Sequence, residues 1–256
     1  MTVPDWLEDA RLPDEEFAQA YDATPAPLRA AIKTGLALAW FHYRPCPDHE
    51  KEQVCDADAG FCRQLQAAPV SWTLLALGSG VRAAARVAAA AVLPVLAGVR
   101  QIFAICEPDP HQTILTSLDL TGICDLFCLA AGQPSELIAS LAGTPGRIML
   151  LGHWPEVAES AAQAGIPFHE EKSEPALLLA DPDAFEPDIL RFCQGIVPPT
   201  CQKDPDCVYA LASNARCPQS FLRLAPGCEG FWLFRNLTPA FFRARAHRFN
   251  LYEGEG

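Results

Sequence analysis

From Ser71 onward the chain alternates short apolar runs with segments of helical periodicity, and this alternation restricts its fold more than any other feature. Runs without polar alternation are typical of strands that helices bury on both faces. The sequence therefore predicts an α/β fold: a doubly wound, mostly parallel sheet in a Rossmann-like arrangement with right-handed crossovers. The runs are WTLLAL (72–77), VRQIFAIC (99–106), LFCLA (126–130) and IMLL (148–151). The helical segments cover 81–98 and 111–120, and two more open at Pro134 or Ser135 and near Pro155.

The segment before this alternation is predicted to be mainly helical. TPAPLRAAIKTGLALAWFHY offers Thr24 as a cap and Pro25 as the first helical residue. Prolines then end that helix, and 44–62 is predicted to continue as a polar, partly helical segment.

The segment after the alternation carries a weaker pattern. One apolar strand and one helix are still recognisable, and beyond Val197 the chain becomes rich in loops. The predicted elements here are a strand at 176–180, a helix from about 186, short strands at 208–211 and 231–234, and a final helix over FFRARAHRFN, 241–250.

Composition excludes several classes of partner. The chain has 256 residues, half of them hydrophobic, and a formal net charge of −12, which argues against binding to nucleic acid. The N-terminus lacks the pattern of a secretory signal, and the longest uncharged apolar run, 87–99, is shorter than the ~20 residues of a membrane helix. We therefore expect a soluble, cytoplasmic protein without nucleic-acid or membrane partners, in which a protein partner or a homo-oligomer is compatible with the sequence.

Four segments follow one another in an order that a known family shares. They are LALGSG, VLPVLAGVRQIFAICEPDP, DLTGICDLFCLAAGQPSELIASLAGT and KSEPALLLADPDAFEPDIL. Their order resembles histidinol dehydrogenase and, more distantly, the aldehyde dehydrogenase-like superfamily, over residues 71–195. Because that family inserts one lobe into the other, the resemblance implies a Rossmann-like lobe at 71–165 and a second, smaller α/β lobe made of 1–70 and 166–256.

The resemblance also implies zinc and a nicotinamide cofactor, and the chain departs from the family at both. The family's zinc-binding helix carries a Gln and a His, whereas FCQGIVPP supplies Gln194 and no following His. A catalytic Glu-His pair and two further zinc ligands have no recognisable counterpart. We therefore expect a shortened chain without the dehydrogenase apparatus. The family's cofactor contacts fall at Leu75 or Ala76 (Tyr in the family), at Gln133 or Glu136 (Gln) and near Pro155 (Asn).

Ligand-binding candidates come from the loops at the carboxyl ends of the predicted strands, which form the ligand crevice of an open parallel sheet. A turn with two glycines before a helix N-terminus favours a phosphate, although the third glycine of the dinucleotide fingerprint is missing. The histidine-carboxylate loop is compatible with acid–base chemistry, and the tryptophan with stacking on a planar ligand. A tight turn, a capped loop and core packing would account for the same residues. The candidates are Gly78, Ser79, Gly80, Arg82, Glu107, Asp109, His111, Gln133, His153 and Trp154.

The eleven cysteines are expected to be structural thiols rather than a disulfide scaffold. Their spacing matches no tight zinc or iron–sulfur motif, so no metal ligand is assigned. A mixed site would need the two ends of the chain to meet. The metal-compatible residues are His42, Cys46, His49 and Cys55 near one end and Cys193, Cys201, Cys207, Cys217 and Cys228 near the other.

Three functions are therefore compatible with the sequence. The first is a small-molecule-binding or interaction protein with a phosphate-bearing ligand at the Gly78–Gly80 turn. The second is a divergent oxidoreductase that uses NAD or NADP. The third, a metal- or cluster-carrying redox accessory protein, depends on the cysteines alone.

Overall fold

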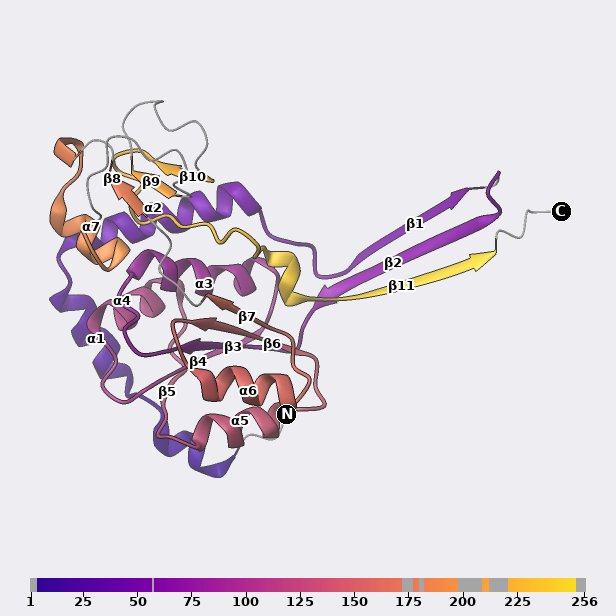
Figure 1. The fold of residues 1–256 in the computed structure, drawn as a ribbon, viewed down its shortest axis with the longest axis horizontal. Coiled ribbons are helices and arrows are strands. Elements are labelled where there is room, and N and C mark those ends of the chain that lie inside the picture. The colour runs from indigo at the N-terminus through magenta and orange to yellow at the C-terminus, as the bar shows by residue number, and fades with distance from the viewer. Residues whose placement is uncertain are drawn as a thin grey trace.

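The computed structural model describes residues 4–56, 58–171, 177–179, 182–197, 209–211 and 221–251, and at its centre lies a five-stranded sheet (Figure 1). The strand order is β5-β4-β3-β6-β7, and every neighbouring pair is parallel. This confirms the predicted α/β fold with a parallel sheet. Only the edge strand β7 was not predicted. The strands are β3 (Trp72–Leu77), β4 (Gln101–Cys106), β5 (Leu126–Cys128), β6 (Gly146–Leu151) and β7 (Phe168–Glu171).

Helices cover both faces of this sheet, two on each side (Figure 1). The side chains of β3 alternate between the two resulting cores: Leu75 and Leu77 pack with α3 and α4, while Leu74 and Ala76 pack with α5 and α6. All six residues of β3 are buried, which explains why the strand carries no polar alternation. The helices are α3 (Ala84–Leu96), α4 (Gln112–Thr121), α5 (Gln133–Leu141) and α6 (Pro155–Gln163).

Helix α3 is buried on nearly all sides, because the sheet lies under it and α2 (Ala26–Tyr43) lies over it (Figure 1). Its alanines allow both neighbours to approach closely. The helix ends before Gly98, whose φ of 84° is the left-handed conformation that glycine adopts most easily. The Ala-Gly turn thus leads from a buried helix into a buried strand.

The N-terminal helices confirm the predicted helical start, with one correction. Thr24 does not cap α2; its hydroxyl donates to Ala20 O at the end of α1 (Asp14–Ala23) and lies 2.8 Å from the hydroxyl of Thr116 in α4. Pro25 precedes α2 as its N-terminal flanking residue. Thr24 therefore joins α1 to α4, because Pro25 occupies the capping position and Thr24 lies one residue before it.

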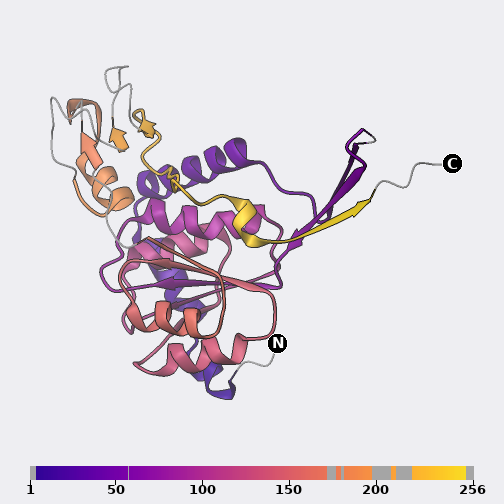
Figure 2. The same ribbon diagram turned by 45° about the vertical axis from the view of Figure 1, so that its right-hand side comes forward.

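Residues 50–56, 61–69 and 243–251 form a separate antiparallel sheet that projects from the parallel sheet and its helices, which we call the body (Figures 1 and 2). We call this sheet the arm; its strands are β1 (Glu50–Asp56), β2 (Phe61–Pro69) and β11 (Arg243–Leu251), in the order β1-β2-β11. The predicted helical continuation at 44–62 and the predicted final helix are therefore wrong. Both segments lack an apolar face, because nearly every residue of β1 and β11 is exposed, and their cross-strand partners lie far away in sequence.

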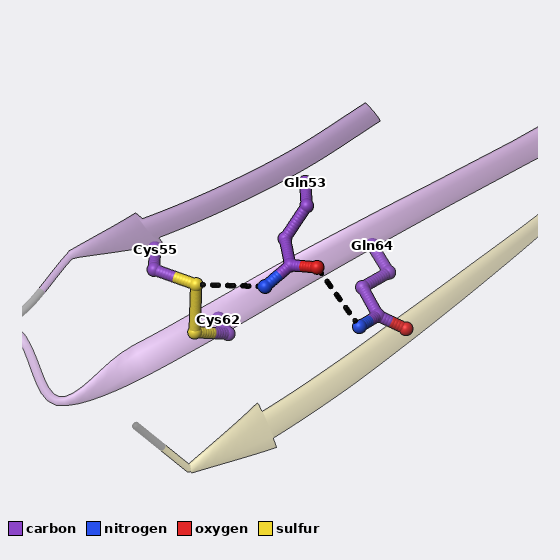
Figure 3. The surroundings of a disulfide bond; sticks show 4 residues. All are labelled: Gln53, Cys55, Cys62 and Gln64. Atoms are coloured by element: carbon purple, nitrogen blue, oxygen red, sulfur yellow. Dashed lines mark hydrogen bonds between the residues drawn. A yellow bond between two sulfur atoms is a disulfide. The ribbon is translucent and has the colours of Figure 1, made fainter. Parts of the chain in front are cut away.

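A disulfide joins the two strands of the hairpin, Cys55 to Cys62 (Figure 3). Beside it, Gln64 Nε2 donates to Gln53 Oε1 across the same two strands. The expectation that the cysteines are structural thiols is wrong for this pair, because the hairpin register places the two residues opposite each other. Cys46, Cys106, Cys124, Cys128, Cys193 and Cys228 are free.

The remaining elements are short, and among them α7 packs on α2 and α3. A third sheet has the order β10-β9-β8, with parallel pairs. The strand predicted at 231–234 is wrong, because that segment is a loop whose Gly230 lies so close to α2 that a side chain would collide with Ala31 O. These elements are η1 (Asp5–Ala10), β8 (Leu177–Leu179), η2 (Pro182–Ala184), α7 (Pro187–Gln194), β9 (Tyr209–Leu211), β10 (Leu222–Leu224) and η3 (Pro239–Phe242). Of the predicted segments, residues 176, 180, 181 and 208 lie outside the described residues.

No helix among the described residues is long and apolar enough to cross a membrane.

Candidate functional site

The strand order places the candidate loops at one edge of the sheet. The chain runs from β3 outward to β4 and β5, then returns to the other side of β3 for β6 and β7. In open parallel sheets, ligands bind beyond the carboxyl ends of the strands at such a reversal. Here the loops after β3 and β6 pack directly on one another: Gly78 N donates to Leu151 O (2.8 Å), and Ser79 forms a bridge with His153. The space between β3 and β6 is therefore largely closed.

A cavity opens instead between the loops after β3 and β4. It has a volume of about 440 Å³, within the range of small-molecule sites. Seven of the ten candidate residues line it: Gly78, Ser79, Gly80, Arg82, Glu107, Asp109 and His111. We call this cavity the rim cavity.

The other three candidates lie elsewhere. His153 lines a smaller cavity of about 260 Å³, together with Ser79, Gly80 and Arg82. Trp154 packs into the core under α6 and is only 7% exposed. Gln133 opens α5, where its Oε1 accepts a hydrogen bond from Ala130 N (2.7 Å). Neither Gln133 nor Trp154 lines the rim cavity.

The two glycines of the β3–α3 turn have different roles. A Cβ on Gly78 would lie 2.8 Å from His153 O, so the packing of the two loops requires glycine at this position. Gly80 has a φ of 82°, and a Cβ there would meet no atom within 4 Å. The positive φ therefore explains why residue 80 is a glycine, and the empty space around it leaves room for a ligand.

The N-terminus of α3 follows this turn and carries no side-chain cap. Its flanking residue Ala83 makes no capping hydrogen bond, and its first turn contains no acidic residue. Uncapped backbone N–H groups and the helix dipole favour an anion. Residues 83–86 at this start are buried and do not line the rim cavity. The positive charge of this wall therefore comes from Arg82, which lines the cavity directly before the helix.

The opposite wall is the β4–α4 loop and carries two carboxylates. Asp109 has a φ of 65°, in the left-handed region, between Pro108 and Pro110. Aspartate tolerates this conformation better than most residues, and such outliers concentrate at functional sites. Glu107 and Asp109 therefore offer hydrogen-bond acceptors across from Arg82.

His111 caps α4 and faces the same cavity. Its Nδ1 accepts from the backbone N–H of Thr113 (3.3 Å), which leaves Nε2 as a hydrogen-bond donor in the neutral ring. Partial burial lowers the pKa of His111, and the charge of Arg82 lowers it further. The ring is therefore held neutral at physiological pH.

The described residues do not fit the zinc site that the family resemblance implies. Gln194 is fully buried, and its Nε2 donates to Glu229 O (2.7 Å) while its Oε1 has no hydrogen-bond partner. Across the described ranges, no three His, Cys, Asp or Glu side chains come together as metal ligands. Cys201, Cys207 and Cys217 lie outside the described residues.

The rim cavity contains a thiol that was not among the candidates predicted from the sequence. Cys106, the last residue of β4, lines the cavity, and its Sγ lies 3.7 Å from Sγ of Cys128, the last residue of β5. The available signal was that two neighbouring strands, QIFAIC and LFC, both end in cysteine. Only the strand register shows that the two residues are partners.

Comparison by sequence finds no matching family model and no matching curated protein. Comparison by structure finds histidinol dehydrogenase from Elizabethkingia anophelis, with a TM-score of 0.61 over 96% of this chain and 78% of that chain, at 11% identity. The chain has a histidinol dehydrogenase-like fold. This confirms the predicted resemblance at the level of the fold, which is all that an identity of 11% shows.

Aldehyde dehydrogenases also match, over a smaller part of their length. Succinate-semialdehyde dehydrogenase from Burkholderia pseudomallei matches with a TM-score of 0.38 and 15% identity, over 70% of this chain and 45% of that chain. Lactaldehyde dehydrogenase from Escherichia coli matches with a TM-score of 0.36 and 14% identity, over 66% and 46%. The chain thus spans less than half the length of these two enzymes.

Proposed function

We propose that this histidinol dehydrogenase-like chain binds a small phosphate-bearing molecule in the rim cavity and does not carry out the dehydrogenase reaction. The observation that carries the proposal is the polarity of that cavity. Arg82 lines one wall, and Glu107 and Asp109 line the other.

Such a cavity suits a ligand with two different ends. An anionic group would lie against the guanidinium of Arg82, where it forms charge-assisted hydrogen bonds. Hydroxyl or amino groups would donate to the carboxylates of Glu107 and Asp109, and the Nε2–H of His111 supplies a further donor. A sugar phosphate or a nucleotide has this combination of groups.

The residues for zinc chemistry support binding over dehydrogenation. Nε2 of Gln194, the candidate zinc ligand, donates to the carbonyl of Glu229, and no group of metal ligands surrounds the residue within the described part of the chain. A dehydrogenase of this family would need an anchored cation and a base beside the cofactor.

A divergent NAD- or NADP-dependent oxidoreductase is the second candidate, and the fold favours it. In that case the same loop would hold the pyrophosphate of the cofactor, and the carboxylates would accept from ribose hydroxyls. Two observations favour the binding protein over the oxidoreductase. Packing against His153 accounts for the glycine at position 78 without a cofactor, and the third glycine of the dinucleotide fingerprint is missing.

The test is the melting temperature of the full chain with ribose 5-phosphate, inorganic phosphate, NAD or NADP. A ligand that binds only the folded state stabilises it by about 2.7 kcal/mol at a hundredfold excess over Kd, a shift of roughly 5–10 °C for a chain of this size. We expect a shift with the sugar phosphate. A shift with NAD or NADP alone would favour the oxidoreductase, and no shift with any of the four would contradict the proposal.

Two variants locate the site. Arg82→Ala should abolish the shift, whereas Arg100→Ala, an exposed arginine at the opposite end of the same sheet, should keep it. Asp109→Asn retains a residue that tolerates the left-handed conformation and removes the charge, so it should weaken the sugar phosphate more than inorganic phosphate. Equal weakening by Arg82→Ala and Arg100→Ala would place the ligand outside the rim cavity.

A further inference from the structure

Two free cysteines lie side by side at the carboxyl edge of the sheet. Cys106 ends β4 and Cys128 ends β5, and the two are direct partners in the parallel register. Register partners point to the same face of a sheet, and both side chains pack against the core under α3 and α4. Their sulfur atoms are 3.7 Å apart.

The pair has the spacing of a dithiol that can close to a disulfide. Neighbouring strands lie about 4.8 Å apart, and disulfides join residues whose Cα atoms are roughly 4.4–6.8 Å apart. Rotation of the side chains is therefore enough to bring the sulfur atoms to the bonding distance of about 2.05 Å. No movement of the strands is required.

A metal site explains the pair less well. Structural zinc takes four ligands and catalytic zinc three, and within the described ranges no third His, Cys, Asp or Glu joins the two thiols. Two thiols that contact each other, without a third metal ligand beside them, are better suited to forming a disulfide, which releases two electrons.

The two thiols differ in burial and in protonation. Cys106 is 2% exposed, whereas Cys128 is partly exposed. The hydrogen bond from Cys106 lowers the pKa of Cys128, although burial opposes this. The same hydrogen bond raises the pKa of Cys106, and burial raises it further. Cys128 is thus the more accessible thiol and the one that loses its proton more readily, and Cys106 lies behind it.

We propose that Cys106 and Cys128 form a redox-active dithiol that reduces a low-molecular-weight disulfide at the carboxyl edge of the sheet, where Cys128 is partly exposed. The Cys128 thiolate attacks one sulfur of that disulfide; a mixed disulfide forms, the substrate S–S bond breaks, and the released half takes up a proton as a thiol. Cys106 then gives its proton to water, and its sulfur attacks Cys128 Sγ. The bond from Cys128 to the substrate breaks, and the second half leaves as a thiolate that is protonated.

The balance is two electrons passed from the cysteine pair to the small disulfide. Of the two protons that the two released thiols take up, one is the proton that Cys106 gives to water, and the other comes from the solvent, which had received the Cys128 proton. Formation of the mixed disulfide also removes the Cys128 thiolate, whose hydrogen bond is the main cause of the raised pKa of Cys106. Cys106 therefore becomes easier to deprotonate at the step that needs it. This inference does not depend on the phosphate-bearing ligand proposed above.

The experiment starts from the fully reduced chain and adds glutathione disulfide. After rapid alkylation and digestion without reductant, mass spectrometry should find a peptide pair linked through Cys106 and Cys128. Cys106→Ser should stop the reaction halfway and accumulate glutathione on Cys128. Cys128→Ser should leave Cys106 unmodified, because the buried thiol has lost its reactive partner.

Cys124 is the matched control, because it is a partly exposed cysteine only four residues before Cys128 and burial raises its pKa. Iodoacetamide should modify Cys128 at least about tenfold faster than Cys124 at neutral pH, since the thiolate is the reactive form. Cys124→Ser should leave the cross-link unchanged.

Three outcomes would overturn the proposal. These are the absence of the linked peptide under conditions that re-form the Cys55–Cys62 disulfide, glutathione spread equally over Cys124 and Cys128, and no trapped glutathione on a folded Cys106→Ser chain. If Cys106→Ser does not fold, the cross-link in the unmodified chain and the two alkylation rates still decide the matter.

Discussion

The parallel sheet of the body and the antiparallel sheet of the arm are continuous in the chain, yet they are stabilised in opposite ways. All six residues of β3 are buried, whereas all seven residues of β1 are exposed. Only Val70 and Ser71 separate β2 in the arm from β3 in the body. Strands can therefore pair without a hydrophobic core beside them. The apolar residues of a core make the strands of the body recognisable in the sequence, and the arm lacks such residues.

Covalent and polar contacts hold the arm together. Across the hairpin, the Cys55–Cys62 disulfide is accompanied by an exposed ion pair between Arg63 and Glu52 (3.1 Å). An exposed ion pair contributes at most about 1 kcal/mol. At its base, Arg243 is buried and donates to Pro47 O, Ala67 O and Ala97 O. The arm therefore depends on its disulfide and on its junction with the body.

The largest expected difference between the two sheets is in the free energy of unfolding that is lost when a bulky side chain is replaced by alanine. Trp72 in β3 is fully buried, lies directly against Gly146 and donates from Nε1 to Thr144 Oγ1 (2.8 Å). Trp72→Ala should lower the free energy of unfolding by about 3–5 kcal/mol. Phe61→Ala, in the exposed part of the arm, should change it by less than about 0.5 kcal/mol. Urea denaturation of both variants measures this, and similar losses would show that the arm has a core of its own.

The next effect tests the junction. Arg243→Met removes three hydrogen bonds to carbonyl oxygens at distances of 2.7–3.4 Å, and it should cost about 1–3 kcal/mol in urea denaturation. Arg245→Met, two residues later on the exposed part of β11, should be neutral within about 0.5 kcal/mol. If the two variants behave alike, burial of the guanidinium does not stabilise the junction.

A smaller global effect is expected from the disulfide. The double variant Cys55→Ser/Cys62→Ser should change the free energy of unfolding of the body by less than about 0.5 kcal/mol, because opening the arm exposes no core. Amide hydrogen exchange over 50–56 and 61–66 should become faster while exchange in β3 stays unchanged. A global loss of about 2–4 kcal/mol, the usual contribution of a disulfide, would mean that arm and body unfold as one unit.

The smallest effect concerns His111, which lines the rim cavity at the start of α4. Because the pKa of His111 is lowered from its ordinary 6.5, the unfolded chain binds the proton first as the pH falls. The contribution of neutral His111 is therefore complete above about pH 6.5 and is lost below it. His111→Asn, which keeps a good capping residue, should flatten the dependence of the melting temperature on pH between about 5 and 7. An unchanged profile would assign the dependence to other groups.

The sequence predicted the site residues only where it also predicted the strand that precedes them. WTLLAL and QIFAIC identify two buried strands, and in a parallel sheet their carboxyl ends share an edge, so Gly80, Asp109 and Arg82 were found together. Trp154 follows a strand in the same way, but it packs under α6 rather than into the cavity. A loop residue's direction depends on the helix that docks beside it, which local sequence does not specify.

By itself, the sequence determined the body of this protein, because an uninterrupted apolar run that must be covered on both sides is a local property of the chain. It could not determine the arm: RARAHRFN has no apolar face, and its partner strand lies about 180 residues earlier. Only the tertiary structure paired Cys55 with Cys62 and brought Cys106 to Cys128. Strand register decides which side chains become neighbours, and register is fixed by contacts between segments that are distant in the chain.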